Sequence, residues 1–172
     1  MGTIAAPYWF AYAILGLVAG QRLAELVIAS RNTRALMARG AVEAGASHYP
    51  YIVAVHAGWL LALAGWVAMH MPRINLPLLV VFAGLQAARL WILWTLGPFW
   101  TTRIITLPGA PLVRRGPYRF LRHPSYLVVA LEVAVLPLVF GAWAVAAIFS
   151  ALNAAMLIAR VRIENRALAS RR

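Results

Sequence analysis

The stretch that decides the fold class runs from Leu76 to Leu96 and reads LPLLVVFAGLQAARLWILWTL, with Arg89 as its only charged residue. A helix of about 20 apolar residues crosses the ~30 Å hydrocarbon layer of a bilayer. Further blocks of the same character flank it, and 63% of all residues are apolar, against ~45–50% in an ordinary soluble domain. The sequence therefore predicts an all-α integral membrane protein.

The apolar blocks predict about five transmembrane helices. Proline stands in the opening turn of three of them, where its missing N–H costs little, and Gly141 marks a tight turn between the last two. The first block contains Arg22 and Glu25 and lacks a basic segment before it, so we expect a retained helix rather than a cleaved signal peptide. The expected spans are Ala5–Ala29, Pro50–Met71, Leu76–Leu96, Pro124–Phe140 and Trp143–Arg160.

The charge balance is strongly basic, with 16 basic and 4 acidic residues. The basic residues are all arginines and cluster at the ends of apolar blocks, which favours membrane orientation and anionic head groups over nucleic acid. Thirteen of them fall in the segments 31–39, 103–122 and 160–172, which an odd number of crossings puts on one side. The positive-inside rule then predicts an outside N-terminus and a cytoplasmic C-terminus in a bacterial cytoplasmic membrane.

The chain is expected to form a single membrane domain over residues 1–172, because it shows no internal repeat and no linker. Residues 1–75 are expected to provide two helices and an interfacial segment at Arg31–Glu43, which has a helical pattern. The absence of cysteine excludes disulfides, thiolate catalysis and Cys-ligated zinc. His56 and His70 lack partners at metal-ligand spacing, so we expect no metal site.

The segment from Gly97 to His123 is the longest stretch that does not span the membrane, and long loops in compact domains tend to be functional. It leads into Arg122-His-Pro-Ser-Tyr126 at the start of the fourth span. Free N–H groups at a helix N-terminus favour a carboxylate or phosphate. The loop therefore indicates either a small anionic ligand at the membrane surface or a simple anchor to lipid head groups.

A second pair of polar residues, Arg160 and Glu164, stands four positions apart on the C-terminal helix and so on one face. An isolated pair of this kind is a surface contact that contributes only a few tenths of a kcal/mol. Glu164 is, however, one of four acidic residues and lies on the same predicted side as the arginine-rich loop. The alternative to an isolated surface pair is that the C-terminal helix lies against the loop and places Arg160 and Glu164 beside it.

Two stretches carry a family resemblance. GPYRFLRHPSY, from Gly116 to Tyr126, followed by Arg160-x-Arg-x-Glu164, resembles the isoprenylcysteine carboxyl methyltransferase family from about residue 76 to the end. Upstream, RLxEL at Arg22–Leu26, RGA at Arg39–Ala41 and HYP at His48–Pro50 are similar to a bacterial branch often found beside type III polyketide synthases.

The resemblance implies a membrane methyltransferase without a Rossmann domain, whose core is residues 76–172 and whose cofactor is S-adenosylmethionine. Arg160 and Glu164 would be the catalytic pair, with Arg160 at the acceptor and Glu164 also at the cofactor. This sequence has Ala110 where a histidine is common, and Asn165 where a second acid is common, which bears on the acceptor more than on the cofactor. The implied cofactor-binding residues are Ala110, Pro111, Leu112, Val113, Tyr118, His123, Pro124, Ser125, Tyr126 and Glu164.

The chemistry of the acceptor stays open between two classes of lipophilic molecule. A carboxylate, pKa near ~4, is already ionised and needs only Arg160 to hold it, whereas a phenol, pKa near ~10, needs His123, Glu164 or the arginines to lower its pKa. The resemblance implies alkylresorcinol-type or alkylpyrone-type lipids for the bacterial branch and isoprenylcysteine carboxylates for the family at large. We favour the polyketide-type phenolic lipid.

The sequence leaves two further questions open: an alternative function for the protein, and the role of the charged residues inside the spans. A small membrane transporter or lipid-binding protein could use the arginine-rich loop for an anionic ligand, although the paired broken helices of transporters are not found. Charges inside the spans are functional candidates by default. A structural pair of Arg22 or Arg89 with Glu132 is an equal alternative to a catalytic role for these residues.

Overall fold

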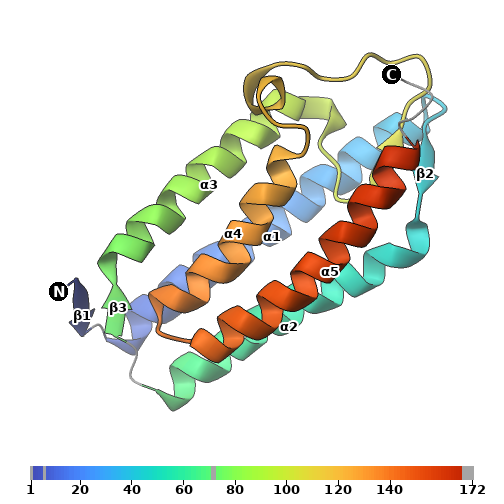
Figure 1. Cartoon of the computed structure of the whole chain (residues 1–172). Coiled ribbons are helices and arrows are strands. Elements are labelled where there is room, and N and C mark those ends of the chain that lie inside the picture. The colour runs from blue at the N-terminus through green and yellow to red at the C-terminus, as the bar shows by residue number, and fades with distance from the viewer. Residues whose placement is uncertain (1, 6, 71–72, 168–172) are drawn as a thin grey trace.

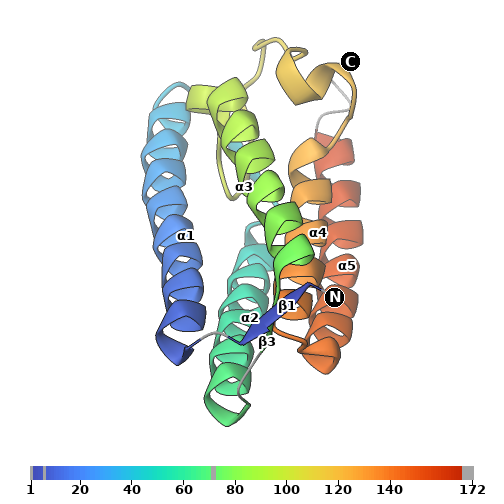
Figure 2. The same cartoon turned by 90° about the vertical axis from the view of Figure 1, so that its left-hand side faces the viewer.

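The apolar blocks form five α-helices that run side by side in one bundle (Figures 1 and 2). The structure is a computed structural model and describes residues 2–5, 7–70 and 73–167. Each expected span is a helix, so the all-α fold class is confirmed. The helices are α1 (Tyr8–Met37), α2 (Tyr49–Met69), α3 (Leu76–Leu96), α4 (Pro124–Val139) and α5 (Trp143–Ala167).

Short elements cap both ends of the bundle. At one end β1 (Thr3–Ala5) pairs antiparallel with β3 (Arg73–Asn75). At the other, β2 (Val42–Ala44) pairs antiparallel with β4 (Ile104–Thr106), beside the 3₁₀ turns η1 (Ala46–His48), η2 (Gly97–Phe99) and η3 (Gly116–Arg119). We call this second end, with residues 97–123, the loop end, and the first the hairpin end. These pairs are the only sheets in the described residues, and neither is the parallel sheet of a Rossmann domain.

The helix expected at Arg31–Glu43 is found only as far as Met37, as a continuation of α1, and the interfacial position of this segment stays a prediction. Helix α1 continues straight through this segment to Met37 and then turns at Gly40, whose φ of 85° is in the left-handed region. The reason is that Leu36 continues the buried face of α1 and packs against Ala41 and Leu107. The remaining residues extend into β2, where β4 satisfies the backbone hydrogen bonds.

The outer faces of the bundle suit lipid rather than water. Large apolar side chains such as Leu17, Leu61 and Trp94 are 76%, 72% and 85% exposed. Four helices are long and apolar enough to cross a membrane: α1, α2 with η1, α3 with η2, and α5. Helix α4 has 16 residues, or about 24 Å at 1.5 Å per residue, and it lies between α3 and α5, which both pack against it.

The apolar core lies in the half of the bundle nearer the hairpin end. Trp59 and Leu63 of α2 meet Leu136 of α4 there, and all three are at most 1% exposed. The turn after α4 closes the core, because Phe140 is buried and its carbonyl accepts a hydrogen bond of 3.1 Å from Trp66 Nε1. Gly141 follows with a φ of 68°, as the expected tight turn requires. Within the described residues, the half of the bundle nearer the loop end has no corresponding buried turn between helices.

A buried ion network crosses the bundle between these halves and joins α1, α3 and α4. Arg89 donates from Nε to Glu25 Oε1 at 2.6 Å and from Nη1 to Glu132 Oε2 at 2.9 Å. Arg22 Nη2 donates to the same oxygen of Glu132 at 2.8 Å, and Gln86 Nε2 donates to its other oxygen at 2.8 Å. Both pairs expected for Glu132 are thus present, and two arginines balance two glutamates.

Replacing Glu132 by Gln tests how far the bundle depends on this network. The amide keeps the size of the side chain but removes the negative charge that faces Arg22 and Arg89. We expect the free energy of unfolding to fall by about 3 kcal/mol, because two buried cations lose a partner. Thermal unfolding in detergent measures the change, and Leu131→Ala, the exposed neighbour on α4, is the control. Equal unfolding temperatures for the two variants would contradict a structural role.

The orientation of the bundle is predicted by the arginines and can be tested with single cysteines, since the chain has none of its own. Thr3 and Ser47 are exposed at the hairpin end and the loop end respectively. We expect a membrane-impermeant maleimide to label Thr3→Cys in intact bacterial cells and Ser47→Cys only after the cytoplasmic membrane is opened. The reverse pattern would show that the positive-inside prediction is wrong.

Candidate functional site

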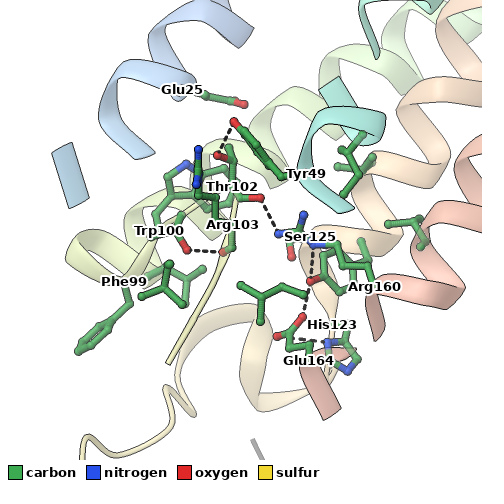
Figure 3. A pocket seen from close by; sticks show the side chains of 18 of the residues that line it. Glu25, Tyr49, Phe99, Trp100, Thr102, Arg103, His123, Ser125, Arg160 and Glu164 are labelled. Atoms are coloured by element: carbon green, nitrogen blue, oxygen red, sulfur yellow. Dashed lines mark hydrogen bonds and ion pairs between the residues drawn. The ribbon is translucent and has the colours of Figure 1, made fainter. Parts of the chain in front are cut away.

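The loop half of the bundle contains a cavity of about 710 Å³. Its walls come from all five helices, with Arg89 and Leu96 from α3, and residues 99–114 close it at the loop end. Most of its lining is apolar, with a limited set of polar groups, as is usual for sites that hold a small molecule. The cavity extends from the loop residues, such as Thr102, to side chains on the helices, such as Glu25 and Arg160 (Figure 3).

The structure brings most of the site residues predicted from the sequence to this cavity. Ala110 and Pro124 are the exceptions: Ala110 packs against the cluster of Leu36, Ala41 and Leu107, and Pro124 is buried in the first turn of α4. The predicted residues that line the cavity are Pro111, Leu112, Val113, Tyr118, His123, Ser125, Tyr126, Arg160 and Glu164.

A polar cluster, Tyr126, Arg160 and Glu164 with Thr102, forms the rim of the cavity. The Tyr126 hydroxyl donates to Glu164 Oε2 and accepts from Arg160 Nε at 2.8 Å. Arg160 Nη2 also donates to the Thr102 carbonyl at 2.7 Å, so α5 is tied to both α4 and the loop (Figure 3). Convergence of Arg160 and Glu164 with the loop, rather than an isolated surface pair, is therefore the arrangement found.

His123 stands beside this cluster and leaves one nitrogen unused. Its ring stacks on Tyr126 at 5.4 Å between centroids, and Nδ1 lies 3.9 Å from Glu164 Oε1. Its other nitrogen, Nε2, is buried and has no hydrogen-bond partner among the described residues. A buried polar atom without a partner costs about 1–3 kcal/mol, so a hydrogen-bond partner brought to this atom would stabilise the site.

Tyr118 contributes a neutral hydroxyl to the cavity wall. Burial raises the pKa of this phenol, and the nearby Glu164 carboxylate raises it further, while a hydrogen bond with Ser125 acts in the opposite direction. The ring packs with Ile92 and Trp100. Tyr118 is therefore suited to hydrogen bonding in its protonated form rather than to service as a base at neutral pH.

The GPYR turn that carries Tyr118 depends on a glycine. Gly116 has a φ of 55°, and a Cβ there would lie 2.5 Å from Thr95 Oγ1 at the end of α3. Arg115 Nη2 donates to the Thr95 carbonyl at 3.3 Å. The absence of a side chain at Gly116 thus lets the loop pack directly on α3 and sets the position of Tyr118.

Sequence reasoning missed the residues that hold residues 97–106 against the helices. Asn32 of α1 donates to the carbonyls of Gly97 at 3.0 Å and Trp100 at 2.8 Å. The Tyr49 hydroxyl of α2 lies 3.1 Å from Thr102 Oγ1. The HYP motif around Tyr49 was a signal, but a single asparagine in the polar run Ser30–Arg34 does not show which part of the chain it contacts.

Two more ties join the first part of the chain to the loop. Arg103 pairs with Glu43 of β2 at 3.1 Å and lies over the Tyr49 ring at 4.7 Å. Gly45 lets the chain pass close to α5, since a Cβ there would lie 3.0 Å from Ile163. The N-terminal helices are thus part of the site and not only of the membrane anchor. No group of three or more metal-ligating side chains occurs in the described residues.

Fold and site together define a helical membrane protein with a chamber that is polar at the loop end and mostly apolar within the bundle. The chain belongs to the isoprenylcysteine carboxyl methyltransferase family, whose model matches residues 76–170. This confirms the predicted resemblance and indicates a membrane methyltransferase.

A relative from Bacillus subtilis strain 168 extends the match beyond the family region. This chain is 38% identical to it over 164 residues, which cover 94% of this chain and 96% of the relative, described as "Uncharacterized protein YpbQ". The similarity therefore includes α1 and α2, which line the chamber. No solved structure matches the chain.

The close approach at Gly116 predicts a difference between two glycine substitutions. Gly116→Ala and Gly109→Ala both put a side chain at positive φ, 55° and 74°, but only the first meets another residue within 4 Å. We expect Gly116→Ala to increase cleavage of the loop in limited proteolysis at least threefold over Gly109→Ala, because α3 and the loop must separate. Equal cleavage would contradict the packing role of Gly116.

Proposed function

We propose that this protein is an S-adenosylmethionine-dependent O-methyltransferase that acts on a lipophilic acceptor at the membrane. The observation that carries the proposal is the division of one cavity, in which the family motif forms a polar rim and α1, α2 and α5 form an apolar chamber. A charged cofactor from the cytosol and a lipid from the bilayer need these two environments side by side.

The rim fits the polar parts of S-adenosylmethionine. Glu164 Oε1 makes no hydrogen bond to any residue that the structure describes, so it is able to accept from the cofactor's ammonium group or ribose hydroxyls. The unpartnered His123 Nε2 lies beside it. Arg114 and Arg122 line the same part of the cavity and suit the cofactor's carboxylate. The segment Pro111–Val113, which has no regular secondary structure, offers backbone groups for the adenine ring.

Methyl transfer needs positioning and electrostatics more than a protein nucleophile. When bound, the cofactor would supply an electrophilic methyl group for an in-line displacement by the acceptor oxygen. Arg160 is suited to hold that oxygen, because its Nε and Nη2 are fixed by Tyr126 and Thr102 while Nη1 makes no hydrogen bond within the described residues. Its guanidinium is thus oriented before any acceptor binds.

The acceptor is a polyketide-type phenolic lipid in our proposal, with an isoprenylcysteine carboxylate as the other candidate. The apolar chamber suits the hydrocarbon of either. A phenol must also lose its proton, and the free Nε2 of His123, with Glu164 behind Nδ1, is a base that such an acceptor needs. A carboxylate would have no use for it. The arginines at the loop end serve the cofactor and anionic lipid rather than nucleic acid.

Three variants of α5 test the proposal and the roles on it. Arg160 lies one turn nearer the centre of the bundle than Glu164, where a lipid's polar head can reach it while the stem of the arginine stays in apolar surroundings. We expect Arg160→Ala to lower methyl transfer at least a hundredfold with S-adenosylmethionine affinity within about threefold of wild type, because about 2–3 kcal/mol of acceptor binding is lost. Glu164→Ala should lower cofactor affinity as well.

Binding of tritiated S-adenosylmethionine to detergent-purified protein and methylation of a phenolic lipid are the two measurements. Arg162→Ala is the matched control, since Arg162 is exposed on the same helix and does not line the cavity. Absence of cofactor binding at high micromolar concentration would contradict the proposed function and favour a transporter or lipid-binding protein. Loss of cofactor binding in Arg160→Ala but not in Glu164→Ala would reverse the assigned roles.

A further inference from the structure

The HYP motif at His48–Pro50 lies outside the region that the family model matches, yet its tyrosine reaches the rim of the cavity. Tyr49 is the first residue of α2, and its hydroxyl shares a hydrogen bond of 3.1 Å with Thr102 Oγ1 (Figure 3). The proposed reaction does not use this tyrosine. Its contacts with the loop lead, however, to Arg160, the residue assigned to the acceptor oxygen.

The orientation of the Arg160 guanidinium depends on two hydrogen bonds. Nε donates to the Tyr126 hydroxyl at 2.8 Å, and Nη2 donates to the Thr102 carbonyl at 2.7 Å. A guanidinium is a rigid planar fork, so a hydrogen bond at one nitrogen alone leaves the plane free to swing about that nitrogen. Bonds at two nitrogens fix the plane and with it the direction of the third nitrogen, Nη1. The Thr102 carbonyl therefore supplies half of the orientation.

The two anchors of Arg160 are held in different ways. Tyr126 stands in the first turn of α4, where the helix fixes the backbone. Thr102 lies in a bend between η2 and β4 and belongs to no helix or strand. Neither the hydrogen bonds of a helix nor those of a strand pair set the direction of its carbonyl. Contacts made by side chains must do so.

Tyr49 contacts both residues that flank the peptide group in question. The carbonyl that Arg160 uses belongs to the peptide group between Thr102 and Arg103. The Tyr49 hydroxyl holds the Thr102 side chain, and the guanidinium carbon of Arg103 lies 4.7 Å from the centroid of the Tyr49 ring. This distance is within the range of a cation–π contact. One side chain of α2 thus holds the peptide group from both ends.

The hydroxyl of Tyr49 is the less replaceable of its two contacts. Arg103 has a second hold, because its Nη1 lies 3.1 Å from both carboxylate oxygens of Glu43 in β2. Thr102 Oγ1 has no other hydrogen-bond partner among the described residues. Loss of the Tyr49 hydroxyl would therefore free the Thr102 end of the peptide group while the Arg103 end stays in place.

We propose that Tyr49 is a positioning residue for the acceptor arginine, because it holds the peptide group whose oxygen fixes the plane of the Arg160 guanidinium. The proposal rests on the proposed function for the role of Arg160. Tyr49 acts through Thr102 and not through contact with the reacting oxygen. The family region alone therefore lacks one of the groups that orient its own arginine, and α2 supplies it.

Tyr49→Phe and Thr102→Val test the proposal by removing the two sides of one hydrogen bond. Phenylalanine keeps the ring against Arg103, and valine keeps the backbone carbonyl, so the fold is retained. We expect each variant to lower methyl transfer to a phenolic lipid about fivefold, the effect of one net hydrogen bond, with S-adenosylmethionine affinity within about twofold of wild type. The double variant should be no slower than either single variant, because both break the same bond. In an Arg160→Ala background, Tyr49→Phe should have no further effect.

A second measurement reports the position of Arg160 without turnover. Phenylglyoxal modifies arginine side chains, and mass spectrometry of the detergent-purified protein without cofactor or acceptor gives the rate at each arginine. Arg162, which is exposed on the same helix, is the internal reference. We expect the ratio of Arg160 to Arg162 modification to rise about threefold in Tyr49→Phe, because a guanidinium that loses one of two hydrogen bonds is free for a larger share of the time.

Tyr51→Phe is the matched control, since Tyr51 lies on the same helix, is 63% exposed and does not line the cavity. It should change neither measurement. Wild-type values in Tyr49→Phe would overturn the proposal. So would losses that add in the double variant, which would indicate direct contact of Tyr49 with the acceptor, or a loss that persists in the Arg160→Ala background, which would indicate a general effect on the fold. If the modification ratio rises but the wild type methylates no lipid, the positioning of Arg160 stands and the proposed reaction fails.

Discussion

The buried ion network of Arg22, Glu25, Arg89 and Glu132 is the constraint on which the rest of the structure depends. It links α1, α3 and α4 at one level of the bundle. Between helices in lipid the hydrophobic effect gives little attraction, so hydrogen bonds and close packing must hold them together. These ion pairs also fix the depth of each of the three helices along the bundle axis and the rotation of each helix about its own axis. Because three of the four residues line the chamber, the same contacts that join the helices form its polar wall.

The network divides the bundle into two halves that are stabilised differently. Toward the hairpin end, apolar side chains such as Trp59, Leu63 and Leu136 fill the interior. Toward the loop end the interior contains the chamber, and two smaller apolar clusters beside it are supplemented by ties at the perimeter. These ties join Asn32 to the loop carbonyls, Glu43 to Arg103, and β2 to β4. A chamber can be kept open because the other half of the bundle supplies the core.

Hydropathy alone located the helices, because the thickness of a bilayer sets the length of an apolar block. It could not locate the end of α1, where Arg31 and Arg34 suggest an interface while Leu36 continues the buried face. The family motif indicated the rim. The inner wall of the chamber could not be predicted, because a lone Asn153 in an apolar helix carries no sign of what it faces, and His56 and Arg22, which line the same chamber, are distant in sequence.

The Tyr126 hydroxyl has a consequence for how the two ends of the site communicate. It donates to Glu164 and accepts from Arg160, so one O–H group belongs to both residues. A ligand that draws Glu164 away changes the charge that Arg160 feels through Tyr126, and a ligand on Arg160 does the same in return. For the two ligands of the proposed function, occupancy of either side would therefore be thermodynamically linked to the other with equal strength in both directions. Free energies assigned to Arg160 and Glu164 separately will not add.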